Sequence, residues 1–179
     1  MAIEVSNLVQ TRIPTKHGEF VLHYFSNTLD EKEHVAFVFG NVTNKTQVSV
    51  RIHSECFTGD VFGSRRCDCG EQLDKALQLI SEHGFGVLIY LRQEGRGIGL
   101  LKKLQAYNLQ DQGMDTVDAN IYLGHLADER EYSIAALMLE NLQIKSIQLI
   151  TNNPNKIDQL QSLGINVEGR IPIEIESNC

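Results

Sequence analysis

Three of the four cysteines lie in one short stretch of the chain, RIHSECFTGDVFGSRRCDCGEQ, which runs from Arg51 to Gln72. The spacing C-x10-C-x-C of Cys56, Cys67 and Cys69 predicts a metal bound by three sulfurs. Soft thiolates in a tetrahedral site select zinc over magnesium or calcium. A disulfide between Cys67 and Cys69 would strain the loop, because only one residue separates them. Any fold of this chain must therefore bring position 56 beside positions 67 and 69.

The coordination of this metal is left open by the sequence. Structural zinc sites are closed by four protein ligands, whereas catalytic sites keep a position for water. His53, three residues before Cys56, would close a structural site of the Cys3His type. Without His53 only three ligands are local, because the fourth cysteine, Cys179, is the last residue and is expected to be a free thiol. The count of local thiols favours an open, catalytic metal, but the spacing alone does not decide.

Length and composition predict one ordinary globular domain. The chain has 179 residues, of which 42% are hydrophobic and 22% charged, so we expect a single domain over residues 1–179. No apolar run approaches the roughly 20 residues that cross a bilayer. The N-terminal residues show no secretory signal, and clustered cysteines are typical of a reducing compartment. We therefore expect a cytoplasmic protein.

The distribution of charge indicates a small anionic ligand. A net charge of −7 and a pI near 5.3 argue against binding to nucleic acid, which needs a broad basic surface. Six of the eight arginines nevertheless lie between residues 51 and 130. Some of them are expected to pair with surface carboxylates. In an acidic protein, a concentration of arginines in one region indicates that the ligand is a small anion.

Hydrophobic periodicity predicts an α/β fold, with a mixed β-sheet flanked by helices in a single domain. The N-terminal part is rich in strands and the C-terminal part alternates between strands and helices. Four helices are expected. They run from near Gly70 to Gly84, from about Ile98 to Gln112, from Ser133 to Leu142, and from Pro154 to Gly164. The expected strands are 19–25, 34–39, 48–53, 86–91, 146–150, 165–167 and 171–175.

Two loops at strand ends are candidates for binding phosphate through backbone N–H groups. The first, RQEGRGIGL, follows the strand 86–91, but its G-x-G-x-G spacing differs from the dinucleotide fingerprint. The second is TNNPNK, for which a simple capping turn is an equally good interpretation. Asp128 precedes Glu129 and Arg130, and an ion pair between such neighbours is common. Beside a zinc-bound water, Asp128 could instead serve as a general base.

Taken together, these stretches resemble the GTP cyclohydrolase II family, the zinc enzymes that open the riboflavin pathway. The matching segments are RIHSECFTGDVFGSRRCDCGEQL, RQEGRGIGL, YNLQDQGMDTVDAN, LADERE and TNNPNK, in order from residue 51 to 156. The resemblance implies hydrolysis of GTP to 2,5-diamino-6-ribosylamino-4(3H)-pyrimidinone 5′-phosphate, formate and pyrophosphate. It also implies Zn2+, Mg2+ with the triphosphate, and a homodimer.

The resemblance assigns roles by position. Cys56, Cys67 and Cys69 would hold zinc, Asp128 would be the proton acceptor, Arg130 the proposed nucleophile and Tyr107 an active-site tyrosine. A guanidinium stays protonated at neutral pH, so for Arg130 we expect stabilisation of the transferring phosphoryl group instead. The residues implied to contact GTP are Arg51, Ile52, His53, Ser54, Glu55, Gln72, Glu94, Gly95, Arg96, Thr116, Thr151 and Lys156.

One alternative from a different class remains open. A zinc site closed by His53 would be structural, and the arginines would then be displayed to a nucleotide or an acidic protein without turnover. Family members commonly carry a longer C-terminal tail, or a second riboflavin-pathway enzyme in the same chain. We expect neither here, because this sequence ends at Cys179 and no partner domain precedes residue 1.

Overall fold

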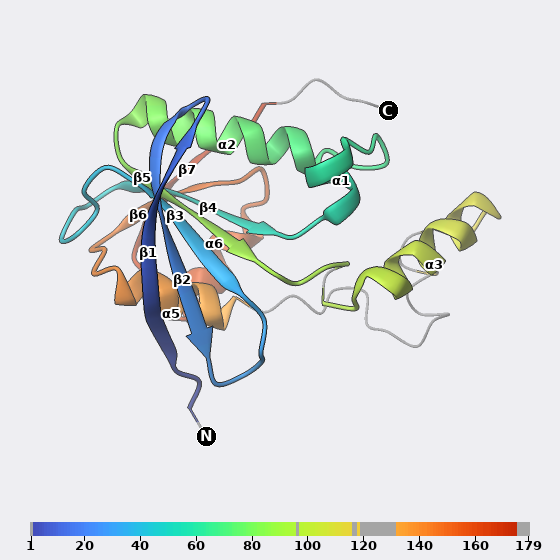
Figure 1. Ribbon diagram of the computed structural model, residues 1–179, viewed down its shortest axis with the longest axis horizontal. Coiled ribbons are helices and arrows are strands. Elements are labelled where there is room, and N and C mark those ends of the chain that lie inside the picture. Colours follow the sequence, from blue (N-terminus) through green and yellow to red (C-terminus); the bar gives the residue numbers. More distant parts are fainter. Residues whose placement is uncertain (1, 96, 116–117, 119–131, 175–179) are drawn as a thin grey trace.

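A mixed seven-stranded sheet forms the centre of the molecule in a computed structural model that describes residues 2–95, 97–115, 118 and 132–174 (Figure 1). The strand order is β1-β2-β3-β5-β4-β6-β7. The strands are β1 (Val5–Thr15), β2 (Gly18–Asn27), β3 (His34–Phe39), β4 (Val48–Ser54), β5 (Gly86–Leu91), β6 (Ile147–Ile150) and β7 (Val167–Ile171). The helices are α1 (Phe57–Phe62), α2 (Cys69–His83), α3 (Leu100–Asp111), α5 (Ser133–Asn141) and α6 (Asn155–Ser162). The predicted α/β class, with a mixed sheet flanked by helices, is confirmed.

Helices cover both faces of the sheet. Ala76 and Ile80 of α2 pack with Leu88 of β5 on one face, whereas α5 and Leu160 of α6 pack with the valines of β4 and β5 on the other (Figure 1). In β4 the side chains alternate between these two environments. Val48, Val50 and Ile52 join the α5 face, so the intervening Ser49, Arg51 and His53 point towards the α2 face. The polar residues of β4 are therefore buried beneath α1 and α2.

The direction of the central strands decides where a site can form. β4 pairs in parallel with both β5 and β6, so all three strands end at the same edge of the sheet. β3 joins β5 antiparallel and extends the sheet into the hairpin of β1 and β2. From β4 the chain crosses to β5 on one side, while β6 lies on the other. Ligands of open α/β sheets bind at such a switch point, beyond the carboxyl ends of the strands.

Most of the expected elements are confirmed, with boundaries that shift by one or two residues. The strand His34–Phe39 and the strand Gly86–Leu91 have the predicted bounds. Among the elements of the described residues, two were missed: β1 and the short helix α1. The expected strands 165–167 and 171–175 are wrong as a pair, because a single strand, β7, spans the supposed gap. In the described part of the chain, no helix has the length and apolar content needed to span a membrane.

Candidate metal centre

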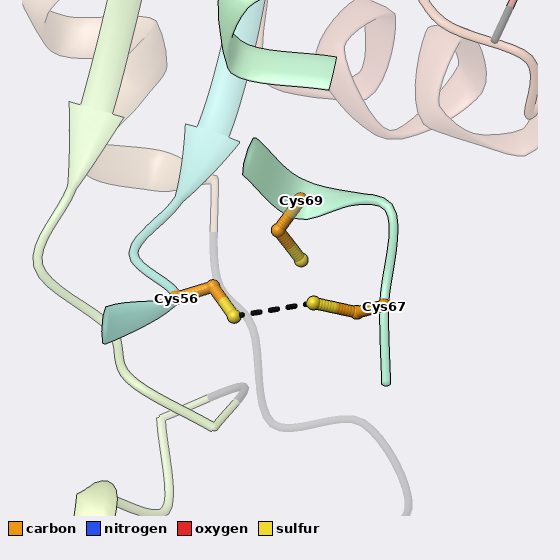
Figure 2. Close-up of side chains that lie close together, drawn as sticks. All are labelled: Cys56, Cys67 and Cys69. Carbon is orange, nitrogen blue, oxygen red and sulfur yellow. Dashed lines mark hydrogen bonds between the residues drawn. The ribbon is translucent and has the colours of Figure 1, made fainter. Parts of the chain in front are cut away.

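The three clustered cysteines meet at the edge of the sheet where β4 ends (Figure 2). Cys56 follows β4 and precedes α1, Cys67 lies in the loop after α1, and Cys69 is the first residue of α2. Their sulfurs all lie within 4.8 Å of one another, and the Sγ atoms of Cys56 and Cys67 are 3.5 Å apart. Three sulfurs bound to one tetrahedral zinc at about 2.3 Å would be about 3.8 Å apart. The donor set therefore fits a zinc ion.

Two glycines allow α1 and α2 to approach closely enough for this arrangement. A Cβ on Gly59 would lie 2.9 Å from the Cys67 sulfur and 3.1 Å from the Cys56 sulfur. A Cβ on Gly70 would collide with the carbonyl oxygen of Gly59. Any side chain at either position would push the helices, and hence the thiols, apart.

The protonation of the metal-free thiols is uneven. Hydrogen bonding from Cys69 lowers the pKa of Cys56 to about 4, burial opposes this change, and the Lys103 ammonium reinforces it. Burial raises the pKa of Cys67, and hydrogen bonding to Cys56 raises that of Cys69. The surroundings of Cys56 therefore favour its thiolate form more than those of Cys67 and Cys69 do, and binding of a metal to the cluster releases protons.

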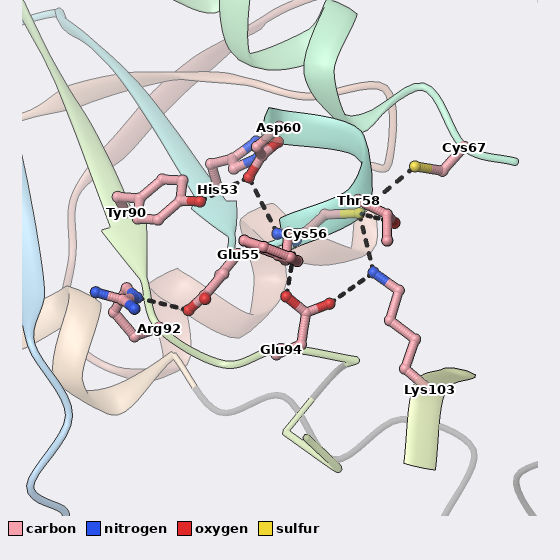
Figure 3. Close-up of polar contacts among 11 residues, drawn as sticks. His53, Glu55, Cys56, Thr58, Asp60, Cys67, Tyr90, Arg92, Glu94 and Lys103 are labelled. Carbon is pink, nitrogen blue, oxygen red and sulfur yellow. Dashed lines mark hydrogen bonds and ion pairs between the residues drawn. The ribbon is translucent and has the colours of Figure 1, made fainter. Parts of the chain in front are cut away.

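The side chain of His53 is engaged by other protein side chains and not by the cysteine cluster. Its Nε2 lies 3.0 Å from Oδ1 of Asp60, and its ring stacks on Tyr90 with centroids 5.5 Å apart (Figure 3). Asp60 also accepts hydrogen bonds from the Tyr90 hydroxyl, at 2.7 Å, and from the Cys56 backbone N–H, at 3.0 Å. Among the described residues, the group able to hold a metal consists of the three cysteines and no histidine. The Cys3His alternative therefore loses its fourth ligand.

Two glutamates expected to contact nucleotide flank the cysteines. Glu94 is 8% exposed and accepts hydrogen bonds from the Phe57 N–H at 2.8 Å and from Lys103 at 2.7 Å (Figure 3). Glu55 accepts a hydrogen bond from Arg92 at 2.6 Å. Gly95 follows Glu94 with a positive φ of 63°, so the chain turns there towards α3. These contacts fix the loop after β5 against the end of β4.

Four other expected nucleotide contacts lie around the ends of β4 and β6. Arg51 donates to the Ile150 carbonyl at 3.0 Å and to Oε1 of Gln72 at 3.2 Å. Thr151 is buried directly after β6, and Lys156 lies in the first turn of α6. Arg51, Ile52, Thr151 and Lys156 line one small cavity of about 10 Å³. This cavity is too small for a nucleotide as it stands.

The space next to the cysteines is larger. A cleft of about 610 Å³ opens beside Cys67 and is lined by residues of α1, the following loop and the start of α2. At the end of β4, the hydroxyl oxygen of Ser54 is buried and has no hydrogen-bond partner within the described ranges. The cleft leaves room for a ligand beside Cys67, but among the described residues none of those expected to contact GTP lines it.

Tyr107 of α3 lies beneath a cation. The Arg66 guanidinium is 4.4 Å from the centre of its ring, and Arg66 also pairs with Asp111 at 2.8 Å. Arg66 thus connects the cysteine loop to α3. The remaining site predictions, Arg96, Thr116, Asp128 and Arg130, fall on residues outside those that the structure describes.

Three residues that surround the cysteines were missed by sequence reasoning: Asp60, Tyr90 and Lys103. Asp60 lies inside a segment that had no predicted element, and Tyr90 stands in an apolar strand where packing was the natural interpretation. Lys103 lies in the expected helix 98–112. The burial of its charge depends on the fold of the preceding glycine loop, which no periodicity predicts.

The fold and the site define a class of protein: an α/β protein with three clustered thiols, able to hold a metal ion, at the carboxyl edge of parallel strands. Sequence comparison agrees with this class. Residues 6–172 match the family GTP cyclohydrolase II, and the chain belongs to that family.

Similar proteins include both short and long chains. The chain is 51% identical over 176 residues to a GTP cyclohydrolase-2 from Hahella chejuensis, covering 98% of this chain and 85% of that protein. It is 52% identical over 174 residues to the riboflavin biosynthesis protein RibBA of Bacillus subtilis, covering 97% of this chain and 44% of that protein. A RibBA from Chlorobium phaeovibrioides is 51% identical, and 43% of its length is covered. The chain therefore spans less than half of the RibBA proteins that it matches.

One solved structure shares the fold. The two-domain 3,4-dihydroxy-2-butanone 4-phosphate synthase RibBX from A. baumannii superposes with a TM-score of 0.51 at 20% sequence identity. The match covers 97% of this chain and 41% of the other. At this identity the likeness concerns the fold alone.

Proposed function

We propose that this chain hydrolyses GTP to 2,5-diamino-6-ribosylamino-4(3H)-pyrimidinone 5′-phosphate, formate and pyrophosphate, the first step of riboflavin biosynthesis. The observation that carries the proposal is the three-thiol cluster without a histidine, in a chain that matches the GTP cyclohydrolase II family over residues 6–172. Three thiolates leave a tetrahedral metal one position for a water.

The chain's own residues would divide the work along the edge of the sheet. Cys56, Cys67 and Cys69 would hold Zn2+, which when bound acidifies water and polarises the carbon that is attacked. Asp60 would keep Cys56 in place through its backbone N–H, and Lys103 would place a positive charge beside the Cys56 sulfur. These contacts support a metal centre that is rigid before the substrate arrives.

The nucleotide would be bound by residues on either side of the cysteines. We propose contacts from Arg51, Ile52, His53, Ser54, Glu55, Gln72, Glu94, Gly95, Arg96, Thr116, Thr151 and Lys156. Arg51 and Lys156 supply positive charge near the end of β6, which suits a triphosphate carried with Mg2+. His53 is 3% exposed and its Nε2 faces Asp60, so we propose that it contributes through its backbone. Arg51 is 7% exposed, so adjacent residues of this chain would need to move before its guanidinium could contact a phosphate.

The assay measures all products together. Purified protein loaded with zinc is incubated with GTP and Mg2+, and formate, pyrophosphate and the absorbance of the pyrimidine are followed. Equal amounts of formate and pyrophosphate are expected, and none from a Cys67→Ser variant. Zinc-loaded protein that binds GTP but releases neither product would contradict the proposal.

For the remaining catalytic positions we propose Asp128 as proton acceptor, Arg130 as stabiliser of the transferring phosphoryl group, and Tyr107 as an active-site hydrogen-bond donor. If the charge of Arg130 is what matters, Arg130→Lys keeps part of the activity, because the ammonium preserves that charge. A guanylyl adduct trapped on Arg130 would show that it is a nucleophile instead.

The setting of the enzyme is also part of the proposal. Three free thiols in one cluster are typical of a reducing compartment, which supports the cytoplasm. A homodimer is proposed on the family resemblance alone, and sedimentation equilibrium of the zinc-loaded protein tests it.

A further inference from the structure

Lys103 is a largely covered cation on a helix that has little other attachment to the described part of the molecule. Helix α3 projects from the sheet and its flanking helices (Figure 1), and Ala106 is the buried residue among its twelve. The side chain of Lys103 is nevertheless only 13% exposed. A lysine hidden on an exposed helix requires partners that offset the loss of its hydration.

Those partners belong to the metal centre and to the loop after β5. The Lys103 Nζ lies 2.9 Å from the Cys56 sulfur and 2.7 Å from Oε1 of Glu94 (Figure 3). The other oxygen of Glu94 accepts the N–H of Phe57, the residue after Cys56, at 2.8 Å. Cys56, Lys103, Glu94 and Phe57 therefore form a closed ring of contacts around one metal ligand.

The glycine loop places Lys103 in this ring. The Gly99 N–H donates to the Glu94 carbonyl at 2.8 Å, and the Lys103 N–H donates to the Gly99 carbonyl at 3.1 Å. A Cβ on Gly95 would lie 3.1 Å from Cβ of Lys103. The loop thus folds back onto the first turn of α3, and this close contact directs the lysine towards the cysteines.

The charge of Lys103 offsets a charge that the metal centre creates. Three thiolates and one divalent zinc carry a net charge of −1, and a partly buried site screens that charge less than bulk water does. Lys103 would bring the net charge near to zero and restrain the Cys56 sulfur through a charge-assisted hydrogen bond. Glu94 is 9% exposed at its side chain and holds the ammonium in place from the opposite side. The Lys103–Glu94 ion pair is largely shielded from solvent, unlike exposed ion pairs, which contribute little to stability.

We propose that Lys103 is a positioning residue of the metal centre, whose ammonium bridges Cys56 and Glu94 and thereby raises the affinity for zinc. The inference rests on the proposed function only in the identity of the metal. Residues that support metal ligands from behind typically change metal affinity by about 10–100-fold when they are replaced.

The test measures zinc affinity in the absence of GTP, by competition with a chromophoric chelator. Lys103→Met keeps the length of the side chain and removes the charge, and zinc affinity is expected to fall about 10–100-fold. Lys102→Met removes the same charge from the adjacent position of α3 and should leave zinc affinity unchanged. Lys103→Arg keeps the charge and should retain most of the affinity. Equal affinities in the Lys103→Met and Lys102→Met proteins would overturn the proposal.

A double-variant cycle tests the bridge itself. If Lys103 and Glu94 act as one unit, Glu94→Gln weakens zinc binding in the wild-type background and has little further effect in Lys103→Met. Fully additive losses would show that the two residues act separately and would overturn the bridge. Co2+ loading supplies a second readout, because the sulfur-to-cobalt charge-transfer band should shift in Lys103→Met and stay in place in Lys102→Met. Zinc affinity does not depend on GTP turnover, so failure of the proposed function leaves these outcomes readable.

Discussion

At the scale of single residues, the cysteines proposed to bind the metal are held in place by buried polar side chains that no motif marks. Asp60 is the clearest case. Its carboxylate accepts hydrogen bonds from His53 of β4, Tyr90 of β5 and the N–H of Cys56. Burial disfavours the charged carboxylate, but the hydrogen bonds outweigh it and lower the pKa of Asp60. The Asp60 carboxylate thus joins two strands to Cys56.

Tyr90→Phe tests the contribution of this carboxylate to stability. The variant keeps the ring stacked on His53 and removes one donor from a buried charged acceptor. The free energy of unfolding of the metal-free protein should fall by about 1.5–3 kcal/mol, as measured by urea denaturation. Tyr24→Phe, on the half-buried surface of β2, is the matched control and should change stability much less. Equal effects of the two substitutions would show that Asp60 does not need the Tyr90 hydroxyl.

The cysteine cluster could be predicted from the sequence because its members are close along the chain. Cys56, Cys67 and Cys69 are separated by a short helix and a loop, so local spacing carries the information. Lys103 and Tyr90 lie more than 30 positions from Cys56, and only the order of the strands and the path of the glycine loop bring them to it. No pattern in a single sequence encodes those long-range contacts.

At the scale of elements, the centre is built where two helices meet. The first turn of α2 lies against α1 at Gly59 and Gly70, and the cysteines sit at the ends of both helices. The predicted helix beginning near Gly70 was close to α2, which begins at Cys69. Helix α1 was not predicted, since six residues with a glycine among them give no helical periodicity. Its C-terminal end is set by Gly63, in the left-handed conformation.

Gly70→Ala should disrupt the metal centre through this helix contact. The added methyl group would collide with the Gly59 carbonyl, and relief of such overpacking costs about 1–3 kcal/mol. We expect lower stability by thermal denaturation and less than one zinc per chain by atomic absorption. Gly169→Ala in β7 is the control, because the nearest neighbour of its Cβ is Gln148 Cγ at 4.0 Å. Full zinc content in Gly70→Ala would show that the helices can separate without loss of the site.

The errors in strand prediction also have physical causes. β1 is an edge strand with mostly exposed residues, so it lacks the alternation of a strand with one buried face, and Pro14 near its end argues against a strand in general. β7 lies at the opposite edge and contains Gly169, a residue that strands disfavour, in the gap between the two expected strands. Edges of sheets are the positions where burial imposes the least pattern on sequence.

At the scale of the whole molecule, the fold and the metal centre are separable. The two hydrophobic core clusters are formed by the sheet with α2, α5 and α6, and the partly exposed Cys67 belongs to neither. Removal of the metal should therefore leave the fold in place. This expectation differs from the behaviour of small zinc domains, which unfold without their metal.

Cys67→Ser provides that test. The variant should keep the circular dichroism spectrum of the parent and unfold cooperatively, but it should bind zinc far more weakly, because oxygen is a poor replacement for a soft thiolate ligand. Chelator treatment of the parent protein is the independent control and should give the same spectrum. Loss of secondary structure in both samples would show that the zinc is structural.

The stability of the molecule should also depend on pH through His34. This side chain is fully buried at the start of β3, accepts the Arg92 N–H at Nδ1 and faces Asp30 at Nε2. Burial lowers its pKa below the usual 6.5, although Asp30 opposes the change. The imidazole of His34 therefore takes up a proton near pH 6.5 in the unfolded chain, whereas in the folded protein it does so only at lower pH. The resulting stability is present above about pH 6.5 and is lost as the pH falls.

His34→Asn should flatten this dependence, because the amide oxygen can still accept the Arg92 N–H and does not titrate. Urea denaturation between pH 5 and 7.5 measures the slope. His83→Asn, at the exposed end of α2, should leave the slope of the parent protein unchanged. A parent-like slope in His34→Asn would assign the dependence to other groups.

The projecting helix has a practical consequence. Two of its links to the rest of the described chain are the Arg66–Asp111 pair, in which both side chains are exposed, and the Lys103–Glu94 pair, in which both are largely covered. Concentrated salt screens exposed charges far more than covered ones, so strong brine should release Arg66 from α3 before it releases Lys103 from Cys56. Cys56 is 3% exposed and should therefore resist alkylating reagents in brine for as long as Lys103 stays in place.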